Sequence, residues 1–418
     1  MVNRHRLAVL AVLVAVSVLA GGGAPSRAVE PIRIGFSDQL TGSQAPNGRG
    51  VLLGIKIWQE EINAKGGLLG RPVVLDYYDD QSNPALGPSI YTKLMDLDKV
   101  DLLYSVGTYI GSTIMPIVIR HNMVLFSSFA LEVNAKYHYD RYFQTLPYGP
   151  HGRDAISRGF FEAAMTAKPR PRTVALVGSD TEFSHTALVG ARGNAQRLGL
   201  KIVYDRTYPP ATVDFDPIVR VIKEANPDLV FLASYTQDSV GMIRAANEIG
   251  LNPKVFGGAV IGLPFTAVKA LLGPMLNGLL GFEVYVHEPT MNFPGIDAFL
   301  QKYQVRAKAE GVDLLGYYSP VMSYATFQVI AQAVEATHSL DQAKIAAYAH
   351  KATFKTIMGD IRFGPDGEWV EPRVLTVQYR HVHAGDPQQF TKPGVQVILW
   401  PPAYKSGDLL YPYDSVRK

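Results

Sequence analysis

Short runs of apolar, largely β-branched residues alternate along the chain with longer segments in which apolar residues recur at helical spacing. In the segment at 48–65, Leu52, Ile55 and Trp58 fall on one helical face, and Gly66 follows where such a helix ends. The short runs that predict strands in this part of the chain are 32–37, 73–78, 102–106 and 123–127. Strands separated by helices in this way predict a mainly parallel, doubly wound α/β sheet.

The same order of elements begins again near residue 142, which predicts a second α/β half. Its strands are predicted at 142–148, 173–177, 201–204, 228–232, 254–256 and 278–284, and its helices at 151–166, 183–198, 215–225 and 239–249. Three further helices are predicted at 295–310, 317–337 and 341–350. A hairpin is predicted between 360–363 and 368–379, because Gly-Pro-Asp-Gly at 364–367 is typical of a turn. A last strand at 395–400 precedes a tail, rich in Pro and Tyr, that is predicted to be irregular.

Residues 1–28 have the order of a secretory signal peptide, with Arg4 and Arg6 ahead of an apolar run at 7–20. As a helix this run would be about 21 Å long, which is shorter than the roughly 30 Å hydrocarbon core of a bilayer. The small residues Ser26 and Ala28 suit cleavage after Ala28. The chain has no cysteine and therefore no lipid-attachment site. We expect export to the periplasm without an anchor; the alternative is an uncleaved membrane anchor.

The charge of the chain is balanced once residues 1–28 are set aside. They contain three arginines and no acidic residue, so that 37 basic residues remain against 37 acidic ones. A balanced chain argues against nucleic acid as a partner, because nucleic acid requires a basic surface. The remaining length is too great for one core and predicts two domains. The absence of cysteine excludes disulfides, zinc–thiolate sites and a cysteine nucleophile.

One turn brings glycine, serine and threonine together where the third predicted strand meets a helix. Gly107 and Gly111 allow a sharp turn and a close approach of a ligand to the backbone, and Ser112 or Thr113 can cap the helix. The free N–H groups and the dipole of such a helix attract an anion at the edge where the carboxyl ends of the strands meet. The alternative is an ordinary strand–helix turn with a capping serine.

Four short motifs stand at a spacing that is typical of one protein family. They are Ile-Arg-Ile-Gly at 32–35 with Leu-Thr-Gly at 40–42, Glu-Ile-Asn-Ala-Lys-Gly-Gly at 61–67, Tyr-Asp-Asp at 78–80, and the turn at 107–116. Through them the stretch from Ile32 to about Val377 resembles the leucine/isoleucine/valine-binding proteins, which are type I periplasmic solute-binding proteins of ABC importers.

The resemblance implies two Rossmann-like lobes joined by three crossovers, near Pro147, Val284 and Met358. The first lobe would comprise residues 29–147 and 285–357, and the second would comprise 148–284 and 358–400, followed by the tail at 401–418. Such a protein captures a small organic solute between its lobes and hands it to permease subunits of an ABC importer in the inner membrane. Neither catalysis nor a cofactor or metal is implied, and we expect a monomer.

Carried over position by position, the resemblance implies that the ligand's carboxylate lies near Gly111, Ser112, Thr113 and Leu131. Ala259 matches the acidic residue that takes the ligand's amino group, so an α-amino acid would lose its ammonium partner here. The acids that could replace it are Glu132, Asp180, Glu182 and Asp238. The expected ligand is a carboxylate with an apolar or aromatic body, or an amino acid. The candidate ligand-binding residues are Tyr109, Gly111, Ser112, Thr113, Phe129, Ala130, Leu131, Phe183, Tyr235 and Ala259.

The aromatic candidates Tyr109, Phe129, Phe183 and Tyr235 either form a slot around the ligand or pack inward as core residues. His381 and His383 share one face of a predicted strand but lack a third metal ligand nearby. Two other functions stay open. One is a ligand-sensing receptor of the same fold for an amide or urea, and the other is an exported enzyme on a doubly wound fold.

Overall fold

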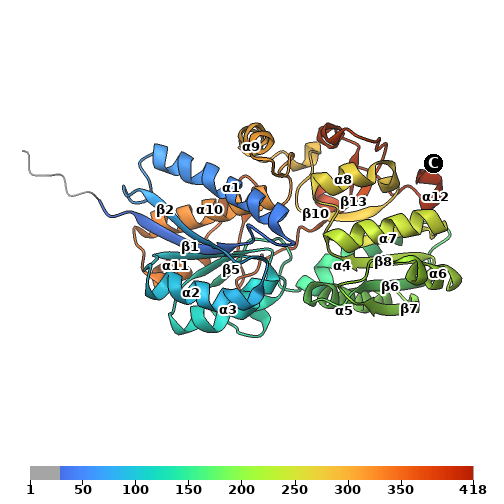
Figure 1. The fold of residues 1–418 in the computed structure, drawn as a ribbon, viewed down its shortest axis with the longest axis horizontal. Coiled ribbons are helices and arrows are strands. Elements are labelled where there is room, and N and C mark those ends of the chain that lie inside the picture. The colour runs from blue at the N-terminus through green and yellow to red at the C-terminus, as the bar shows by residue number, and fades with distance from the viewer. Residues whose placement is uncertain (1–28, 418) are drawn as a thin grey trace, which may run out of the picture.

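The computed structural model describes residues 29–417, so the predicted signal peptide at 1–28 lies outside the described residues. Two β-sheets stand side by side, each with helices on its faces (Figure 1). We call the five-stranded sheet and its helices the first lobe, and the seven-stranded sheet and its helices the second lobe. Both sheets are mainly parallel, which confirms the predicted α/β fold class.

The first lobe has the strand order β2-β1-β3-β4-β5, and all its strands are parallel. Its strands are β1 (Ile32–Asp38), β2 (Val73–Asp79), β3 (Leu102–Val106), β4 (Leu125–Ser128) and β5 (Tyr142–Gln144). Its helices are α1 (Ala45–Ala64), α2 (Gly87–Asp96), α3 (Thr108–Arg120), α9 (Ile296–Glu310), α10 (Ser319–Thr337) and α11 (Gln342–Ala349). The last three confirm the helices predicted late in the chain, and α10 packs along α1 through the ring contact of Phe327 with Trp58.

The second lobe has the strand order β14-β13-β10-β9-β8-β6-β7, in which β13 and β14 run antiparallel to their neighbours. Its strands are β6 (Thr173–Ser179), β7 (Lys201–Tyr208), β8 (Leu229–Ser234), β9 (Val255–Val260), β10 (Leu280–Glu283), β13 (Leu375–Tyr379) and β14 (Gln396–Trp400). Its helices are α4 (Gly152–Ala164), α5 (Glu182–Arg197), α6 (Asp216–Glu224), α7 (Thr236–Ile249) and α8 (Thr266–Leu272). Because parallel strands share a direction, their carboxyl ends meet at one edge of each sheet.

The chain passes between the two lobes three times. The first passage follows β5, and the second runs from β10 to α9. The small hairpin of β11 (Phe354–Thr356) and β12 (Gly359–Ile361) packs against α10, and the carbonyl of Gly367 accepts a bond from the Gln144 N–H at 2.8 Å. The third passage therefore follows Gly367 rather than Met358, because this apolar hairpin is buried on the first lobe.

Two other predictions about the end of the chain are right only in part. The turn at 364–367 is closed by a single bridge between Phe363 and Trp369, whereas β13 pairs with β10 and β14 rather than with residues 360–363. The tail is not wholly irregular, because it ends in the helix α12 (Tyr413–Arg417). Tyr413 is buried in edge contact with Phe256, which holds the tail on the second lobe.

Candidate functional site

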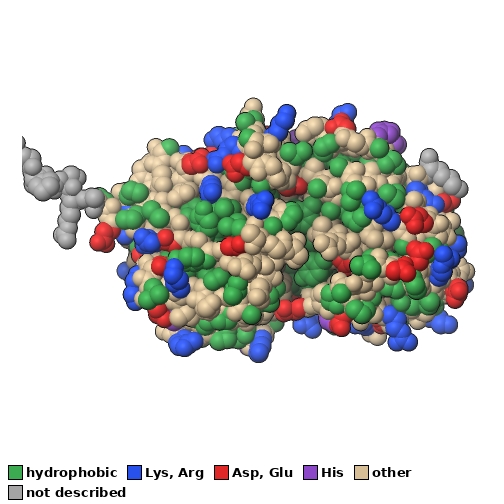
Figure 2. Space-filling view, in the orientation of Figure 1, with side chains coloured by type: hydrophobic (Ala, Val, Ile, Leu, Met, Phe, Trp, Pro, Cys, Tyr) green, Lys and Arg blue, Asp and Glu red, His purple; other side chains and the backbone are tan. Residues whose placement is uncertain are grey.

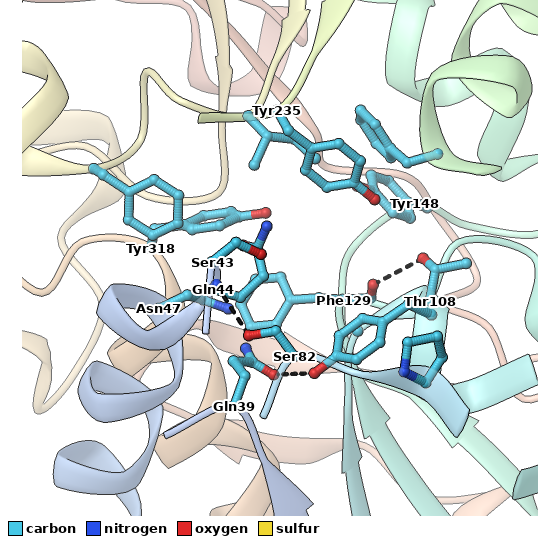
Figure 3. A pocket seen from close by; sticks show the side chains of 16 residues that line it. Gln39, Ser43, Gln44, Asn47, Ser82, Thr108, Phe129, Tyr148, Tyr235 and Tyr318 are labelled. Atoms are coloured by element: carbon cyan, nitrogen blue, oxygen red, sulfur yellow. Dashed lines mark hydrogen bonds between the residues drawn. The ribbon is translucent and has the colours of Figure 1, made fainter. Parts of the chain in front are cut away.

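A cavity of about 210 Å³ lies between the lobes, at the edge where the strands of both sheets end. Figure 2 shows the surface hollowed between the two halves of the molecule, and Figure 3 shows the side chains around the cavity. On the first lobe it is lined by Gln39, Ser43, Gln44, Asn47, Ser82, Pro84, Gly107, Thr108, Tyr109, Phe129 and Tyr318, which we call the first-lobe wall. The second-lobe wall is Phe183, Tyr235, Ile261 and Phe265, and Tyr148 of the first passage lies between the two walls.

The N-terminus of α3 opens onto the first-lobe wall. Gly107 precedes the helix with φ of 87°, a conformation that glycine adopts without strain, and neither a side-chain cap nor an acidic residue stands in the first turn. The first N–H groups of a helix have no acceptor within the helix, so those of Thr108, Tyr109 and Ile110 remain as donors. Together with the helix dipole they favour a negatively charged group at this end of the cavity.

This helix begins one turn earlier than predicted, so Ser112 and Thr113 do not cap it. The Gly111 N–H already donates to the Gly107 carbonyl at 3.1 Å. The Ser112 hydroxyl donates to the carbonyl of Thr108 at 3.2 Å, and the Thr113 hydroxyl donates to that of Ile110 at 2.9 Å. All three residues therefore lie inside the helix, and none of them lines the cavity.

Thr108 connects α3 to the loop after β4. Its hydroxyl donates to the carbonyl of Phe129 at 3.2 Å and accepts the N–H of Leu131 at 3.0 Å (Figure 3). Phe129 itself has φ of 62°, in the left-handed region that few residues other than glycine occupy. These bonds hold the Phe129 ring at the cavity, whereas Ala130 and Leu131 are buried below it.

Carboxamide side chains supply further donors on the first-lobe wall. The Gln39 Oε1 accepts the Tyr109 hydroxyl at 2.5 Å, and the Asn47 Oδ1 accepts the Ser319 hydroxyl. With their oxygens occupied, the amide NH₂ groups of Gln39 and Asn47 are left as the donors that these side chains can offer a ligand. An acceptor group of the ligand, such as a carboxylate, matches this wall.

Aromatic rings form most of the opposite side of the cavity. Phe183 and Tyr235 of the second-lobe wall have ring centroids 5.7 Å apart. Tyr318, at the start of α10, packs against Phe129 at 4.8 Å and against Phe265 at 5.6 Å, and so joins the two walls. The four aromatic candidates Tyr109, Phe129, Phe183 and Tyr235 thus lie around one cavity, with a largely apolar space between them.

Of the residues that the structure describes, no lysine, arginine, aspartate or glutamate lines this cavity. Two buried carboxylates lie beneath the first-lobe wall: Asp80 accepts the Tyr109 hydroxyl at 3.2 Å, and Asp38 accepts the N–H of Gln39 at 2.9 Å. Burial raises the pKa of Asp38 well above its ordinary range and also raises that of Asp80. Both carboxyl groups therefore hold a proton more readily than exposed carboxyl groups do.

The acids that could replace the missing ammonium partner lie elsewhere. Glu132 accepts three bonds from Arg153, Asp180 pairs with His185 at 2.5 Å, and Asp238 accepts the Tyr208 hydroxyl at 2.7 Å. Glu182 does not line the cavity, and Ala259 is fully buried in β9. The described residues thus place no carboxylate on the cavity wall where an ammonium group could be held.

Two further sequence features have a place in the structure. His381 and His383 lie beyond β13, and no group of three potential metal ligands is found within residues 29–417. Within the same range, no helix is both long and apolar enough to span a bilayer.

Comparisons with known proteins agree with this fold. The chain is 24% identical over 363 residues to the leucine-, isoleucine-, valine-, threonine-, and alanine-binding protein of Pseudomonas aeruginosa, covering 85% of this chain and 92% of that one. A leucine binding protein from Thermotoga maritima has a similar structure, with a TM-score of 0.70, 20% identity, and coverage of 85% of this chain and 98% of that one. A solute binding protein of an ABC transporter from Rhodopseudomonas palustris, in complex with p-hydroxybenzoic acid, is also similar in structure. Its TM-score is 0.71, its sequence identity is 20%, and the match covers 85% of this chain and 96% of that one.

The decisive match is to a family model. The model described as periplasmic binding protein matches residues 31–380, which is most of the chain and includes both walls of the cavity. This confirms the resemblance to solute-binding proteins of ABC transporters that the sequence motifs indicate. The chain belongs to the periplasmic binding protein family.

Proposed function

We propose that this protein captures a small carboxylate with a flat aromatic body and delivers it to an ABC importer. The observation that carries the proposal is the contrast across one cavity. An uncharged wall with the open N-terminus of α3 stands on the first lobe, and an aromatic wall stands on the second. The carboxylate would accept bonds from the N–H groups of α3 and the amides of Gln39 and Asn47, and the ring would lie between Phe183, Tyr235 and Tyr318.

The size of the cavity supports a single-ring ligand. Its volume of about 210 Å³ exceeds only moderately the engineered apolar cavity of about 150 Å³ that holds a benzene molecule in another protein. A carboxylate adds the polar end that the first-lobe wall accepts. An α-amino acid would bring an ammonium group for which no acidic residue stands on the cavity wall, at a cost in desolvation.

Proteins of similar structure bind both classes of ligand. Binding proteins from Rhodopseudomonas palustris, 18–20% identical to this chain, are known in complex with benzoate and with 4-hydroxybenzoate. A branched-chain amino acid binding protein from Streptococcus pneumoniae, 17% identical, is known in complex with isoleucine. The uncharged walls described above favour the aromatic acids for this chain. The three carboxamides of Gln39, Gln44 and Asn47 favour an aromatic amide as the second candidate.

The cellular setting follows from the same proposal. Residues 1–28 would be removed on export, the mature protein would act as a monomer in the periplasm, and the permease subunits of the importer would receive the solute. The intact mass of protein recovered from the periplasm tests the export step. A mature chain that still contains Arg4 and Arg6 would contradict it.

Titration calorimetry on a matched panel tests the ligand class. The panel is benzoate, 4-hydroxybenzoate, benzamide, cyclohexanecarboxylate, leucine and isoleucine. We expect the aromatic acids to bind most tightly, with benzamide at least about tenfold weaker because it lacks the charge. Tight binding of leucine or isoleucine together with no binding of any amino-free acid would contradict the proposal. Equal affinities for benzoate and benzamide would favour the amide candidate.

A further inference from the structure

A second cavity, of about 570 Å³, lies where the three passages between the lobes come together. The residues that matter here are Phe293, Arg362, Trp369, Arg373 and Tyr404. The Arg373 N–H donates to the carbonyl of Pro147 in the first passage at 2.8 Å. In the second passage, the Thr290 hydroxyl donates to the carbonyl of Tyr404 at 2.8 Å. The cavity shares no lining residue with the cavity between the walls.

Arg373 is the central side chain of this second cavity. It is only 5% exposed, and its guanidinium lies 4.8 Å from the ring centroids of Phe293 and Trp369 and 5.6 Å from that of Tyr404. These contacts with aromatic rings stabilise the cation across its faces. The Tyr404 hydroxyl also interacts with the guanidinium, whereas the rings of Phe293 and Trp369 offer its N–H groups no acceptor.

Among the described residues, three buried donors that belong to side chains lining this cavity have no hydrogen-bond partner. They are the Nε and Nη2 of Arg373 and the Nε1 of Trp369. A buried donor without an acceptor is costly, and a buried cation more so. Nε and Nη2 form one edge of the guanidinium, and this edge binds two oxygens of a carboxylate or a phosphate side by side.

The charges around the cavity also match an anion. Arg362 lines it as a second cation. Of the two acidic residues in the lining, Asp360 is bound to Lys355 at 2.5 Å, and Glu371 is exposed. No acidic residue forms an ion pair with Arg373 among the described residues.

We propose that this second cavity is an oxyanion site, in which a carboxylate, phosphate or sulfate group accepts bonds from the guanidinium edge of Arg373 and the indole N–H of Trp369. The site is separate from the solute cavity. Because it lies where all three passages meet, an anion bound there would connect segments that lead to both lobes.

Sulfate-dependent stabilisation of the protein tests the proposal in solution. Melting temperature is measured against sulfate concentration, with chloride at equal ionic strength as the reference for general salt effects. We expect a saturable rise for the wild type. For Trp369→Phe, which keeps the ring and removes the N–H, half-saturation should move to about tenfold higher sulfate. Trp58→Phe changes a buried tryptophan on α1; it should lower the melting temperature at every sulfate concentration but leave the half-saturating concentration as in the wild type.

Two further experiments show where in the protein the anion binds. Asn47→Asp, on the first-lobe wall, should leave the sulfate response unchanged, and crystals soaked in selenate should give an anomalous peak beside Arg373. If Arg373→Lys folds, it should lose the saturable response, because lysine lacks the two-nitrogen edge. A sulfate response that is unsaturable, or that Asn47→Asp removes and Trp369→Phe does not, would overturn the proposal. The absence of a selenate peak at Arg373 would also overturn it.

Discussion

The two walls of the solute cavity differ in chemistry although both stand at the carboxyl ends of similar sheets. The first-lobe wall holds the carboxamides and the open N-terminus of α3 beside the rings of Tyr109, Phe129 and Tyr318, whereas the second-lobe wall has no carboxamide and consists of Phe183, Tyr235, Ile261 and Phe265. In the proposed function, the first lobe would bind the polar end of the solute, and the second lobe would cover its apolar body. If the two walls divide the work in this way, substitutions on the first-lobe wall should change the preference for a charged ligand, and substitutions on the second-lobe wall should change the affinity for the ligand's ring.

A charge placed on the first-lobe wall should have the largest effect. Asn47→Asp keeps the size of the side chain and the acceptor for Ser319 but adds a negative charge beside the ligand's carboxylate. At 4 Å and an effective dielectric constant of 20, two such charges repel by about 4 kcal/mol, so we expect benzoate to bind at least about a hundredfold more weakly. Calorimetry should show a much smaller change for benzamide.

The matched control for this change is Asn252→Asp, which adds the same charge in an exposed loop of the second lobe. It should leave the affinity for benzoate within about twofold. An equal loss of benzoate and benzamide affinity in Asn47→Asp would show that the first-lobe wall does not distinguish a charged ligand from a neutral one.

Removal of a ring from the second-lobe wall should have the next largest effect. Tyr235→Ala deletes the partner of Phe183 and should weaken benzoate and benzamide alike, by about 2 kcal/mol or roughly thirtyfold. Tyr235→Phe keeps the ring and should bind nearly as the wild type does. A change in the ratio of benzoate to benzamide affinity in Tyr235→Ala would contradict the division of roles between the walls.

Asp38, which lies beneath the first-lobe wall, should make a smaller, pH-dependent contribution to the free energy of unfolding. Burial raises the pKa of Asp38, and its Oδ2 has no hydrogen-bond partner among the described residues, so Asp38 holds its proton more strongly in the folded chain than in the unfolded chain. The free energy of unfolding should therefore fall as pH rises above the ordinary pKa of about 3.9. Asp38→Asn removes this titration and should stabilise the protein by about 1 kcal/mol at pH 7.

Denaturant unfolding of the wild type and Asp38→Asn between pH 3.5 and pH 8 measures this term. The advantage of Asp38→Asn should shrink as the pH falls to the ordinary pKa of the carboxyl group. A constant difference at all pH values would mean that the buried charge of Asp38 is not the cause.

Ser112→Ala should have the smallest effect. The Ser112 hydroxyl is bonded to the carbonyl of Thr108 within α3, so its loss should change benzoate affinity by less than about twofold. A tenfold loss in calorimetry would instead support the direct carboxylate contact that the family resemblance implies for this residue.

The fold could be predicted from the sequence because its signals are local. Apolar periodicity and glycine stops identify helices such as α1 and α10 without knowledge of their neighbours. The third passage was misplaced because the burial of β11 and β12 on the first lobe depends on the packing of that hairpin against α10. The apolar pattern within the hairpin does not indicate which lobe the hairpin packs against.

The site could be predicted only in part, for a similar reason. Tyr109, Phe129, Phe183 and Tyr235 each follow a predicted strand, so the rule that ligands bind at carboxyl ends finds them. The same rule applied to β1 and β2 would have found Gln39 and Ser82, which were missed. Tyr318 carried no such signal, since it reaches the cavity only because α10 docks along α1.

The misplaced start of α3 has a local cause. Serine and threonine are common helix caps, which favoured Ser112 and Thr113 as the first residues of the helix. The backbone of Gly107 is instead in a conformation with positive φ directly before the helix, so the free N–H groups belong to the residues that follow it. The predicted anion-binding end of the helix therefore moves to Thr108.

The orientation of a bound aromatic acid tests the division of the cavity most directly. A crystal of the protein with 4-bromobenzoate reports both ends of the ligand, because the bromine scatters anomalously and marks the end of the ring opposite the carboxylate. We expect the bromine peak beside Phe183 and Tyr235, with the carboxylate at the N–H groups that begin with Thr108. A bromine peak beside Thr108 and Gln39, with the carboxylate on the second-lobe wall, would contradict the account.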